Sequence, residues 1–285
     1  MSIAIIKERL QRMGAPTAQQ EELALKEIMQ EIALASLSRS GFFSKGAFQG
    51  GTCLRILYGL DRFSEDLDFI LLEEDRSFAW HKFLKNVHDD FSAYGFTMSI
   101  KDRSEASETI KRAFLKEESV GFQLEFLEIV NKSTRKLQIK LEVDVCPPAG
   151  STYEAKFLDF PLNYDLVSQD LPSLFASKCH ALLCRDYIKG RDWYDFAWYI
   201  ARQTNVNYKF LSSALKQVGP WQKQDLAVDK KWLVEHLSKK ISSISWEEAK
   251  TDVERFLNER ARLNLRVWSK EFFLDRLMKL DAYAS

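Results

Sequence analysis

The sequence predicts an α+β protein in which a sheet-containing N-terminal domain is followed by a C-terminal helical domain. Period-two alternation of apolar residues, typical of strands, is confined to the first half of the chain. From about Leu171 the apolar spacing becomes helical. Between these parts, Pro147–Gly150 is expected to end the sheet, because proline cannot donate to a strand ladder. We therefore expect a boundary near residues 150–170 and divide the chain into domains 1–160 and 161–285.

The composition excludes several classes of protein. A hydrophobic content of 46% supplies a real core, and 41 basic residues balance 41 acidic ones, so any polyanion site must be a local patch. No apolar stretch reaches the roughly 18 residues of a membrane helix, and the N-terminus has no signal-peptide core. The four cysteines show no paired spacing. We expect a soluble cytoplasmic protein with reduced thiols and no membrane partner.

The N-terminal domain is expected to open with an amphipathic helix over residues 19–38, because Leu25, Ile28 and Ile32 recur at helical spacing. Gly41 then ends the helix. The elements expected to follow are a strand over 42–49, a helix over 52–58, a strand over 66–72, a helix over 76–94, a strand over 96–100, a loop over 101–111, and two strands over 120–127 and 137–145. The last two strands are expected to pair antiparallel.

The C-terminal domain is expected to be helical throughout, because its apolar residues follow a period near 3.6 and no strand-like alternation interrupts them. The expected helices cover residues 173–187, 191–203, 208–217, 230–240 and 246–280.

The residues that carry chemistry lie between Gly50 and Asp68. Alternate residues of a strand point to one face, so Asp66 and Asp68 share a face while Leu67 points into the core. Carboxylates about 7 Å apart along a strand can share hard divalent cations. The Gly50-Gly51 turn lets backbone amides approach phosphate oxygens, and the helix start after it favours anions. The segment therefore predicts a site for metal and triphosphate.

A third acidic position supports this interpretation. An Asp-x-Asp pair by itself is usually a solvated strand face, and a Gly-Gly pair by itself is usually only a turn. Downstream, however, Glu142 and Asp144 also share one face of an alternating strand. Asp144 is the preferred third carboxylate because it stands at the strand end, where substrate would meet the sheet. Glu142 is the alternative.

Four motifs resemble those of the AbiEii/AbiGii toxin family, a branch of the DNA polymerase β-like nucleotidyltransferases. The first two are Gly50-Gly51-Thr52 with Arg55, and the run Arg62–Phe69 that contains Asp66 and Asp68. The segment Ser173–Arg185, with Lys178, looks like the third motif, and Arg191-Asp192-Trp193-Tyr194-Asp195 looks like the fourth. The resemblance covers roughly residues 19–200. It implies a polymerase-β-like nucleotidyltransferase domain with a mixed sheet, followed by the helical domain.

The resemblance also implies an activity and a set of roles. The family is similar to enzymes that transfer a nucleotide from an NTP to an acceptor, in some members a tRNA 3′ end. Asp66, Asp68 and Asp144 would hold Mg²⁺ or Mn²⁺, with Asp144 helping to deprotonate the acceptor. The groups implied to bind the nucleotide are the backbone of Gly50, Gly51 and Thr52, the side chains of Ser64 and Arg55, and the Lys178 ammonium, which would offset triphosphate charge. Many family members are toxins of toxin–antitoxin pairs tied to phage defence, which implies a cognate antitoxin.

The fourth motif has two interpretations. Arg191 and Asp195 are four residues apart on a helix and could form an ordinary intrahelical pair. The resemblance instead places Arg191, Asp192 and Asp195 at the nucleotide, with Asp192 able to orient Lys178 across two helices. Arg55 and Arg62 are likewise either helix-surface cations or anchors for phosphate or the end of the sheet.

The acceptor stays open at this stage. The leading hypothesis is an RNA acceptor, with tRNA expected, and the alternatives are a small molecule such as an aminoglycoside, a protein hydroxyl, or a catalytically silent module that binds RNA or a partner. A basic C-terminal segment fits an RNA surface or a plain solvated helix face, and its residues are Arg255, Arg260, Arg262, Arg266 and Lys270. The four scattered histidines lack zinc-ligand spacing.

Overall fold

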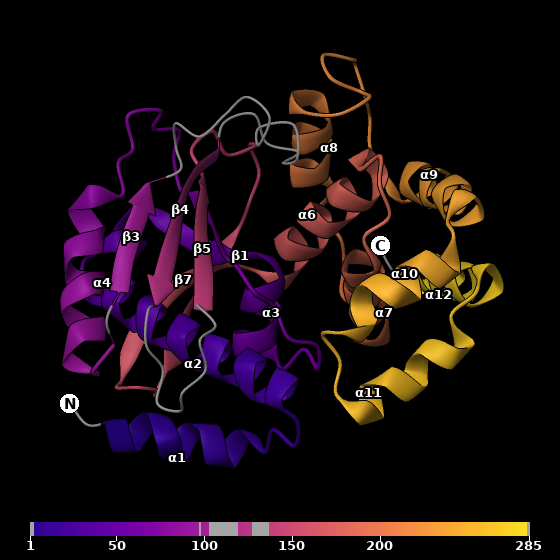
Figure 1. The fold of residues 1–285 in the computed structure, drawn as a ribbon. Helices are drawn as coiled ribbons and strands as arrows, with labels where there is room; N and C mark the ends of the chain where they lie inside the picture. Colours follow the sequence, from indigo (N-terminus) through magenta and orange to yellow (C-terminus); the bar gives the residue numbers. More distant parts are fainter. Residues whose placement is uncertain (1–2, 97, 103–118, 127–136, 284–285) are drawn as a thin grey trace.

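The protein consists of a mixed β-sheet with helices on it and a bundle of helices beside it (Figure 1). The computed structural model describes residues 3–96, 98–102, 119–126 and 137–283. Within them the sheet has seven strands in the order β3-β4-β5-β2-β1-β7-β6. The strands are β1 (Gly46–Gln49), β2 (Leu67–Leu71), β3 (Met98–Asp102), β4 (Ser119–Phe126), β5 (Leu137–Asp144), β6 (Tyr153–Leu158) and β7 (Tyr164–Gln169). The pairs β1–β7 and β2–β5 are parallel and the others antiparallel, so the predicted α+β fold is confirmed.

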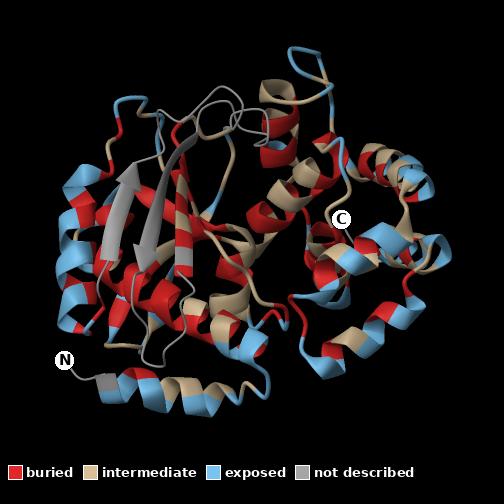
Figure 2. Cartoon of the chain, viewed as in Figure 1, coloured by how far each residue is buried: buried red, intermediate tan, exposed pale blue. Residues whose placement is uncertain are grey.

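One face of the sheet is apolar because alternate residues of its central strands are large and hydrophobic. Helices α2 (Ala18–Arg39) and α4 (His81–Ala93) cover this face. Phe69 of β2 meets the ring of Phe42 at 4.9 Å, and Phe42 stacks on Trp80 at 5.3 Å between ring centroids. The buried residues gather here and between the helices of the bundle (Figure 2). The opposite face of β2 and β5 carries Ile70 but also their acidic residues Asp68, Glu142 and Asp144.

The bundle stands against that polar face. Its helices are α6 (Leu171–Cys184), α7 (Gly190–Ala201), α8 (Tyr208–Gln217), α9 (Lys230–Ser243), α10 (Trp246–Glu254), α11 (Glu259–Leu263) and α12 (Lys270–Tyr283). Helix α3 (Gly50–Tyr58) contacts both β2 and α6, so it joins the sheet to the bundle. Asp170 caps α6 by accepting a hydrogen bond from the Ser173 amide at 3.0 Å. Helix α1 (Ile3–Met13) packs on α2, in a stretch to which the sequence analysis assigned no element.

Most predicted elements of the N-terminal domain are confirmed with small shifts at their ends. The predicted strand over 42–49 begins instead as a 3₁₀ turn, Phe42–Ser44, because Gly41 adopts a left-handed φ of 79° there. The predicted antiparallel pairing of the 120–127 and 137–145 segments is confirmed by β4 and β5. Residues 101 and 102 of the predicted loop over 101–111 belong instead to strand β3, and the rest of that loop lies outside the described residues.

The expectation that Pro147–Gly150 ends the sheet is wrong. The prolines end only strand β5, and the chain returns to the same sheet as the hairpin β6–β7. Strand β7 pairs in parallel with β1 through Phe48 and Ser168. The alternation of β6 is weak because β6 is an edge strand with half-exposed residues. The last strand ends at Gln169 and α6 begins at Leu171, whereas the division at 160/161 stays a prediction.

The expected single helix over 246–280 is also wrong. It is divided into α10, α11, the 3₁₀ turn Asn264–Val267 and α12. Asn258 starts α11 by accepting a hydrogen bond from the Ala261 amide at 2.8 Å, and Ser269 accepts one from the Phe272 amide at 3.2 Å. The helical spacing persists across the breaks because every piece packs on one core. Within the described part of the chain, no helix combines the length and apolar character needed to cross a membrane.

Candidate active site

A pocket opens between the polar face of the sheet and the bundle helices α6 and α7. The sheet side brings the Gly50-Gly51 turn, Asp66, Asp68, Glu142 and Asp144 to its wall, and Ser64 joins them from the loop before β2. The bundle side brings basic residues: Lys178, Arg185, Lys189 and Arg191, with Arg62 reaching in from the loop after α3. Segments far apart in sequence thus place an acidic wall opposite a basic one.

The glycine turn is shaped by close neighbours. Gly50 has a φ of +83°, and a Cβ added to it would lie 2.4 Å from Oδ2 of Asp68. A Cβ on Gly51 would lie 2.5 Å from the Arg62 guanidinium and 3.0 Å from Oγ of Ser64. The backbone therefore passes directly over these polar groups, a proximity that only glycine permits. Thr52 is fully buried, and its hydroxyl donates to the carbonyl of Asp66, so its side chain ties the turn to β2.

The acidic wall follows from the register of β2 and β5. Asp68 pairs with Glu142, and Ile70 pairs with Asp144. Glu142 is thus the direct cross-strand neighbour of Asp68, and Asp144 lies two residues further along. Asp144 is 6% exposed and accepts a hydrogen bond from the Cys146 amide at 3.2 Å.

The carboxylates of this wall are crowded. Burial, and then the charge of Asp68, raise the pKa of Asp66 to about 6. The same two causes, in the same order, raise the pKa of Glu142 to about 7. They outweigh the ion pair of Glu142 with Lys140, whose N–O distance is 2.5 Å. The sheet side therefore holds like charges that a cation would stabilise.

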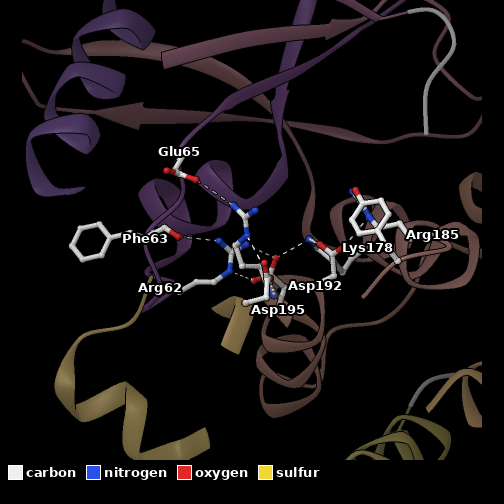
Figure 3. A network of polar contacts seen from close by, with 10 residues as sticks. Arg62, Phe63, Glu65, Lys178, Arg185, Asp192 and Asp195 are labelled. Atoms are coloured by element: carbon white, nitrogen blue, oxygen red, sulfur yellow. Dashed lines mark hydrogen bonds and ion pairs between the residues drawn. The ribbon is translucent and has the colours of Figure 1, made fainter. Parts of the chain in front are cut away.

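The basic wall is held by a buried network (Figure 3). Both oxygens of Asp195 accept hydrogen bonds from the Arg62 guanidinium at 2.6 Å, and the side chains of this pair are 0% and 3% exposed. Lys178 lies 2.7 Å from Asp192 and 2.8 Å from Asp195. Arg185 reaches the other oxygen of Asp192 at 2.9 Å. The predicted contact of Asp192 with Lys178 across two helices is confirmed.

Electrostatics keep this network ionised. Although burial opposes the charged forms, the cations beside Asp192 and Asp195 hold the pKa of both carboxyls well below their usual range. The same carboxylates raise the pKa of Lys178 against its burial. Lys178 is therefore a fixed ammonium, positioned by α7 before any substrate binds.

Arg55, Arg191 and Asp195 have partners that differ from those the sequence suggested. The Arg55 guanidinium pairs with Glu27 at 2.9 Å and donates to the carbonyls of Leu60 and Asp61, so it anchors α3 outside the pocket lining. Arg191 and Asp195 do not pair within their helix, because Asp195 turns to Arg62. Arg191 instead lies 3.7 Å from Glu65 and 3.9 Å from Asp252. It lines the pocket, whereas Asp195 supports the pocket from beneath.

Two pocket residues were missed by the sequence analysis. Arg185 is the C-cap residue of α6 and stands seven positions after Lys178, about two helical turns, so its spacing was a signal that it could reach the same site. Lys189 comes directly before α7 as its N-cap residue. Its position in the pocket depends on the turn between α6 and α7, which no periodicity in the sequence reveals.

The donor set suits a divalent cation in its chemistry. The acidic wall offers only carboxylate oxygens, the ligands preferred by Mg²⁺, and their raised pKa values reflect repulsion that a cation would relieve. Among the described residues, no three acidic, histidine or cysteine side chains form a ready metal cluster. A bound ion would thus be held by these carboxylates together with groups that a substrate supplies.

Comparison with known structures supports the fold. The nucleotidyltransferase toxin MenT4 of Mycobacterium tuberculosis has a similar fold, with 16% identity and with 98% of this chain and 99% of that chain covered at a TM-score of 0.52. JHP933 from Helicobacter pylori is 18% identical, with 92% and 96% covered and a TM-score of 0.45.

The family is identified by a match of the amino-acid sequence to a family profile. The profile described as "Nucleotidyl transferase AbiEii toxin, Type IV TA system" matches residues 32–276, so this chain belongs to the AbiEii nucleotidyltransferase toxin family of type IV toxin–antitoxin systems. No curated protein matches the chain significantly.

Proposed function

We propose that this protein transfers a nucleotide from an NTP to an RNA acceptor, with tRNA the expected acceptor, in a reaction that requires Mg²⁺ or Mn²⁺. The observation that carries the proposal is the pocket with two opposed walls: carboxylates on β2 and β5, and partly buried cations on α6 and α7. A triphosphate needs cations around it, and a metal that accompanies it needs carboxylates. One pocket supplies both.

Each wall has its own part in the reaction. Asp66 and Asp68 would hold the metal, and the register favours Glu142 over Asp144 as the third carboxylate because Glu142 stands beside Asp68. When bound, a divalent cation screens phosphate charge and lowers the pKa of a coordinated hydroxyl. The backbone of Gly50 and Gly51, with the Ser64 hydroxyl, would bind phosphate oxygens.

The basic wall stabilises charge that develops on the phosphates. In nucleotidyl transfer the acceptor hydroxyl gives up its proton, here to a carboxylate of the acidic wall, and its oxygen attacks the α-phosphorus. The bond to the bridging oxygen breaks, and pyrophosphate leaves with that oxygen. Lys178, fixed by Asp192 and Asp195, would face the phosphates as a preorganised cation that needs no reorganisation during the step. Loss of Lys178 would therefore reduce the rate more than the binding of NTP.

The membership in a toxin–antitoxin family supports a role as the toxin, with a cognate antitoxin protein as its partner. We propose that transfer to RNA inhibits growth of the host and that the protein acts in the cytoplasm in phage defence. Expression in the host, with and without the pocket aspartates, tests whether growth inhibition requires the pocket.

Incubation with each of the four NTPs, labelled at the α-phosphate, together with Mg²⁺ and total RNA, tests the reaction. Wild-type protein is expected to label RNA, and Asp66→Asn is expected to abolish labelling. Asp165→Asn, an exposed aspartate on β7, serves as the matched control and is expected to label RNA as wild type does. Label that appears only in protein, or only in an added small molecule such as an aminoglycoside, would refute the RNA acceptor.

A further inference from the structure

Among the described residues, five lysine and arginine side chains line the pocket, and four of them have their charge compensated by the protein. Arg62 holds Asp195, Lys178 contacts Asp192 and Asp195, and Arg185 contacts Asp192. Arg191 lies between Glu65 and Asp252. These four are built into the wall. The fifth, Lys189, differs from them.

The side chain of Lys189 forms no hydrogen bond or ion pair with any other described residue, although it lines the same pocket and is partly buried. The carboxylate of Asp192 acts on Lys189 electrostatically, but it already pairs with Lys178 and Arg185. Burial lowers the pKa of Lys189, and the neighbouring Arg185 and Arg191 act in the same direction, while Asp192 opposes them. The ammonium is thus partly desolvated without a dedicated counter-ion.

The position of Lys189 at the start of a helix increases the positive electrostatic potential around its ammonium. Lys189 is the N-cap residue of the twelve-residue helix α7, so its side chain stands where the helix dipole contributes a further partial positive charge. Its charge also acts on Asp66 across the pocket. A cation at a helix start gains nothing from the helix itself. It is stabilised only if an anion enters the space between the two walls.

We propose that Lys189 binds the β- or γ-phosphate of the NTP in this pocket. The inference rests on the proposed function and adds to it one residue that contacts the triphosphate. The positive charge of this residue is not compensated by the protein itself. In this arrangement Lys178 is the cation that α7 holds in place, whereas Lys189 gains its counter-ion only from the substrate. Its contribution is therefore to the affinity for phosphates and depends on how many phosphates the nucleotide carries.

Calorimetric titration of the four NTPs and the four matching nucleoside monophosphates, with Mg²⁺, tests this. Lys189→Gln is expected to weaken NTP binding about tenfold or more while leaving monophosphate binding unchanged, because a charge-assisted contact to phosphate is lost. Lys189→Arg is expected to retain most of the affinity. Lys231→Gln, an exposed lysine in the first turn of α9, is the matched control and is expected to bind as wild type does.

Three results would overturn the inference, each in a different way. Equal weakening of NTP and monophosphate binding by Lys189→Gln would mean that Lys189 only supports the fold. Unchanged NTP binding with a raised KM for RNA would assign Lys189 to the RNA backbone while the proposed function stands. Absence of NTP binding by wild-type protein would refute the proposed function together with the inference.

A second measurement uses the wild-type chain, so its result does not depend on whether the Lys189 variants fold. Amine acetylation, followed by mass spectrometry, is expected to modify Lys189 less in the presence of an NTP with Mg²⁺ than in the presence of the nucleoside. Lys231 is expected to react equally in both. Equal acetylation of Lys189 under both conditions would contradict the assignment.

Discussion

At the scale of single residues, Gly50 controls the geometry of the acidic wall. Gly50→Ala would place a methyl group 2.4 Å from Oδ2 of Asp68 and force alanine into a φ of +83°. We expect it to destabilise the fold by about 1–3 kcal/mol and to reduce nucleotide transfer well beyond that loss, because Asp68 must move. Thermal unfolding and the transfer assay measure the two effects.

Gly59 provides the matched control for this prediction. It ends α3 with a φ of +71°, but a Cβ there would meet nothing within 4 Å. Gly59→Ala is expected to carry a similar backbone cost and to leave transfer by the folded protein unchanged. If both variants lose activity equally, the contact with Asp68 is not the cause.

Asp195 is expected to act on stability through Arg62. Asp195→Asn leaves the Arg62 guanidinium, only 3% exposed, without its carboxylate. Breaking one partner of a buried pair costs about 3–5 kcal/mol, so a urea titration should show a clearly lower midpoint. Asp225→Asn, which alters a fully exposed carboxylate 3.8 Å from Lys216, is expected to leave the midpoint unchanged. An unaltered midpoint for Asp195→Asn would contradict the account of the network.

The contacts of a site residue could be predicted from the sequence only where its partner lies nearby in the chain. Strand alternation placed Asp66 and Asp68 on one face, and both line the pocket. The partners of Arg55 and Asp195 lie 28 and 133 positions away, so no spacing could reveal them. Which of Glu142 and Asp144 stands beside Asp68 could not be predicted, because the sequence does not state strand register, which pairs Glu142 with Asp68.

At the scale of elements, the start of α7 is positioned by a close approach to α10. A Cβ added to Gly190 would lie 1.8 Å from the carbonyl oxygen of Ala249. Alanine favours a helix by about 1 kcal/mol over glycine, yet the clash with backbone should outweigh this gain and cost about 1–3 kcal/mol overall. We expect Gly190→Ala to lower the unfolding temperature and to weaken NTP binding, since Lys189 and Arg191 flank it. A rise in unfolding temperature would contradict the packing.

Element boundaries were predictable where local signals agreed with packing. The helix over 19–38 was close to the observed Ala18–Arg39, because both its spacing and its ends are local. The breaks within 246–280 were missed because Val253, Leu257 and Ala261 continue the helical spacing into one core. The local signal lay in Asn258 and Ser269, which cap the following helices.

At the scale of the whole molecule, the acidic wall should make metal-free stability depend on pH. Glu142 has a folded pKa of about 7 against an ordinary value of 4.5, so the folded state favours its protonated form. That stability is fully present below about pH 4.5 and is lost as pH rises through about 7, an effect of up to about 3 kcal/mol. Unfolding in EDTA is therefore expected to occur more readily at about pH 8 than at about pH 5.

Glu142→Gln tests the origin of this dependence. It should make the fall in stability between about pH 5 and pH 8 shallower, without removing it, since burial also raises the pKa of Asp66 to about 6 and that of Glu31 to about 7. Glu247→Gln, an exposed glutamate on α10, is the control. Identical pH profiles for Glu142→Gln and wild type would show that the crowded carboxylates do not strain the metal-free protein.

The long-range arrangement could not be predicted from the sequence as fully as the elements could. The two parts of the chain were anticipated, but the return of β6 and β7 to the sheet was not, because β7 pairs with β1 about 120 positions earlier in the chain. That return places Asp170 and the start of α6 beside the sheet, and through α6 it sets Lys178 opposite Asp68. The pocket is thus a product of the whole topology.

The central claim is nucleotidyl transfer in the pocket between the two walls. Its most direct test compares an NTP labelled at the α-phosphate with the same NTP labelled at the γ-phosphate, incubated with the protein, Mg²⁺ and total RNA. The account predicts that only the α-label enters RNA, that the γ-label appears in pyrophosphate, and that Asp68→Asn abolishes both. Transfer of the γ-label to RNA, or α-labelling that survives in Asp68→Asn, would contradict it.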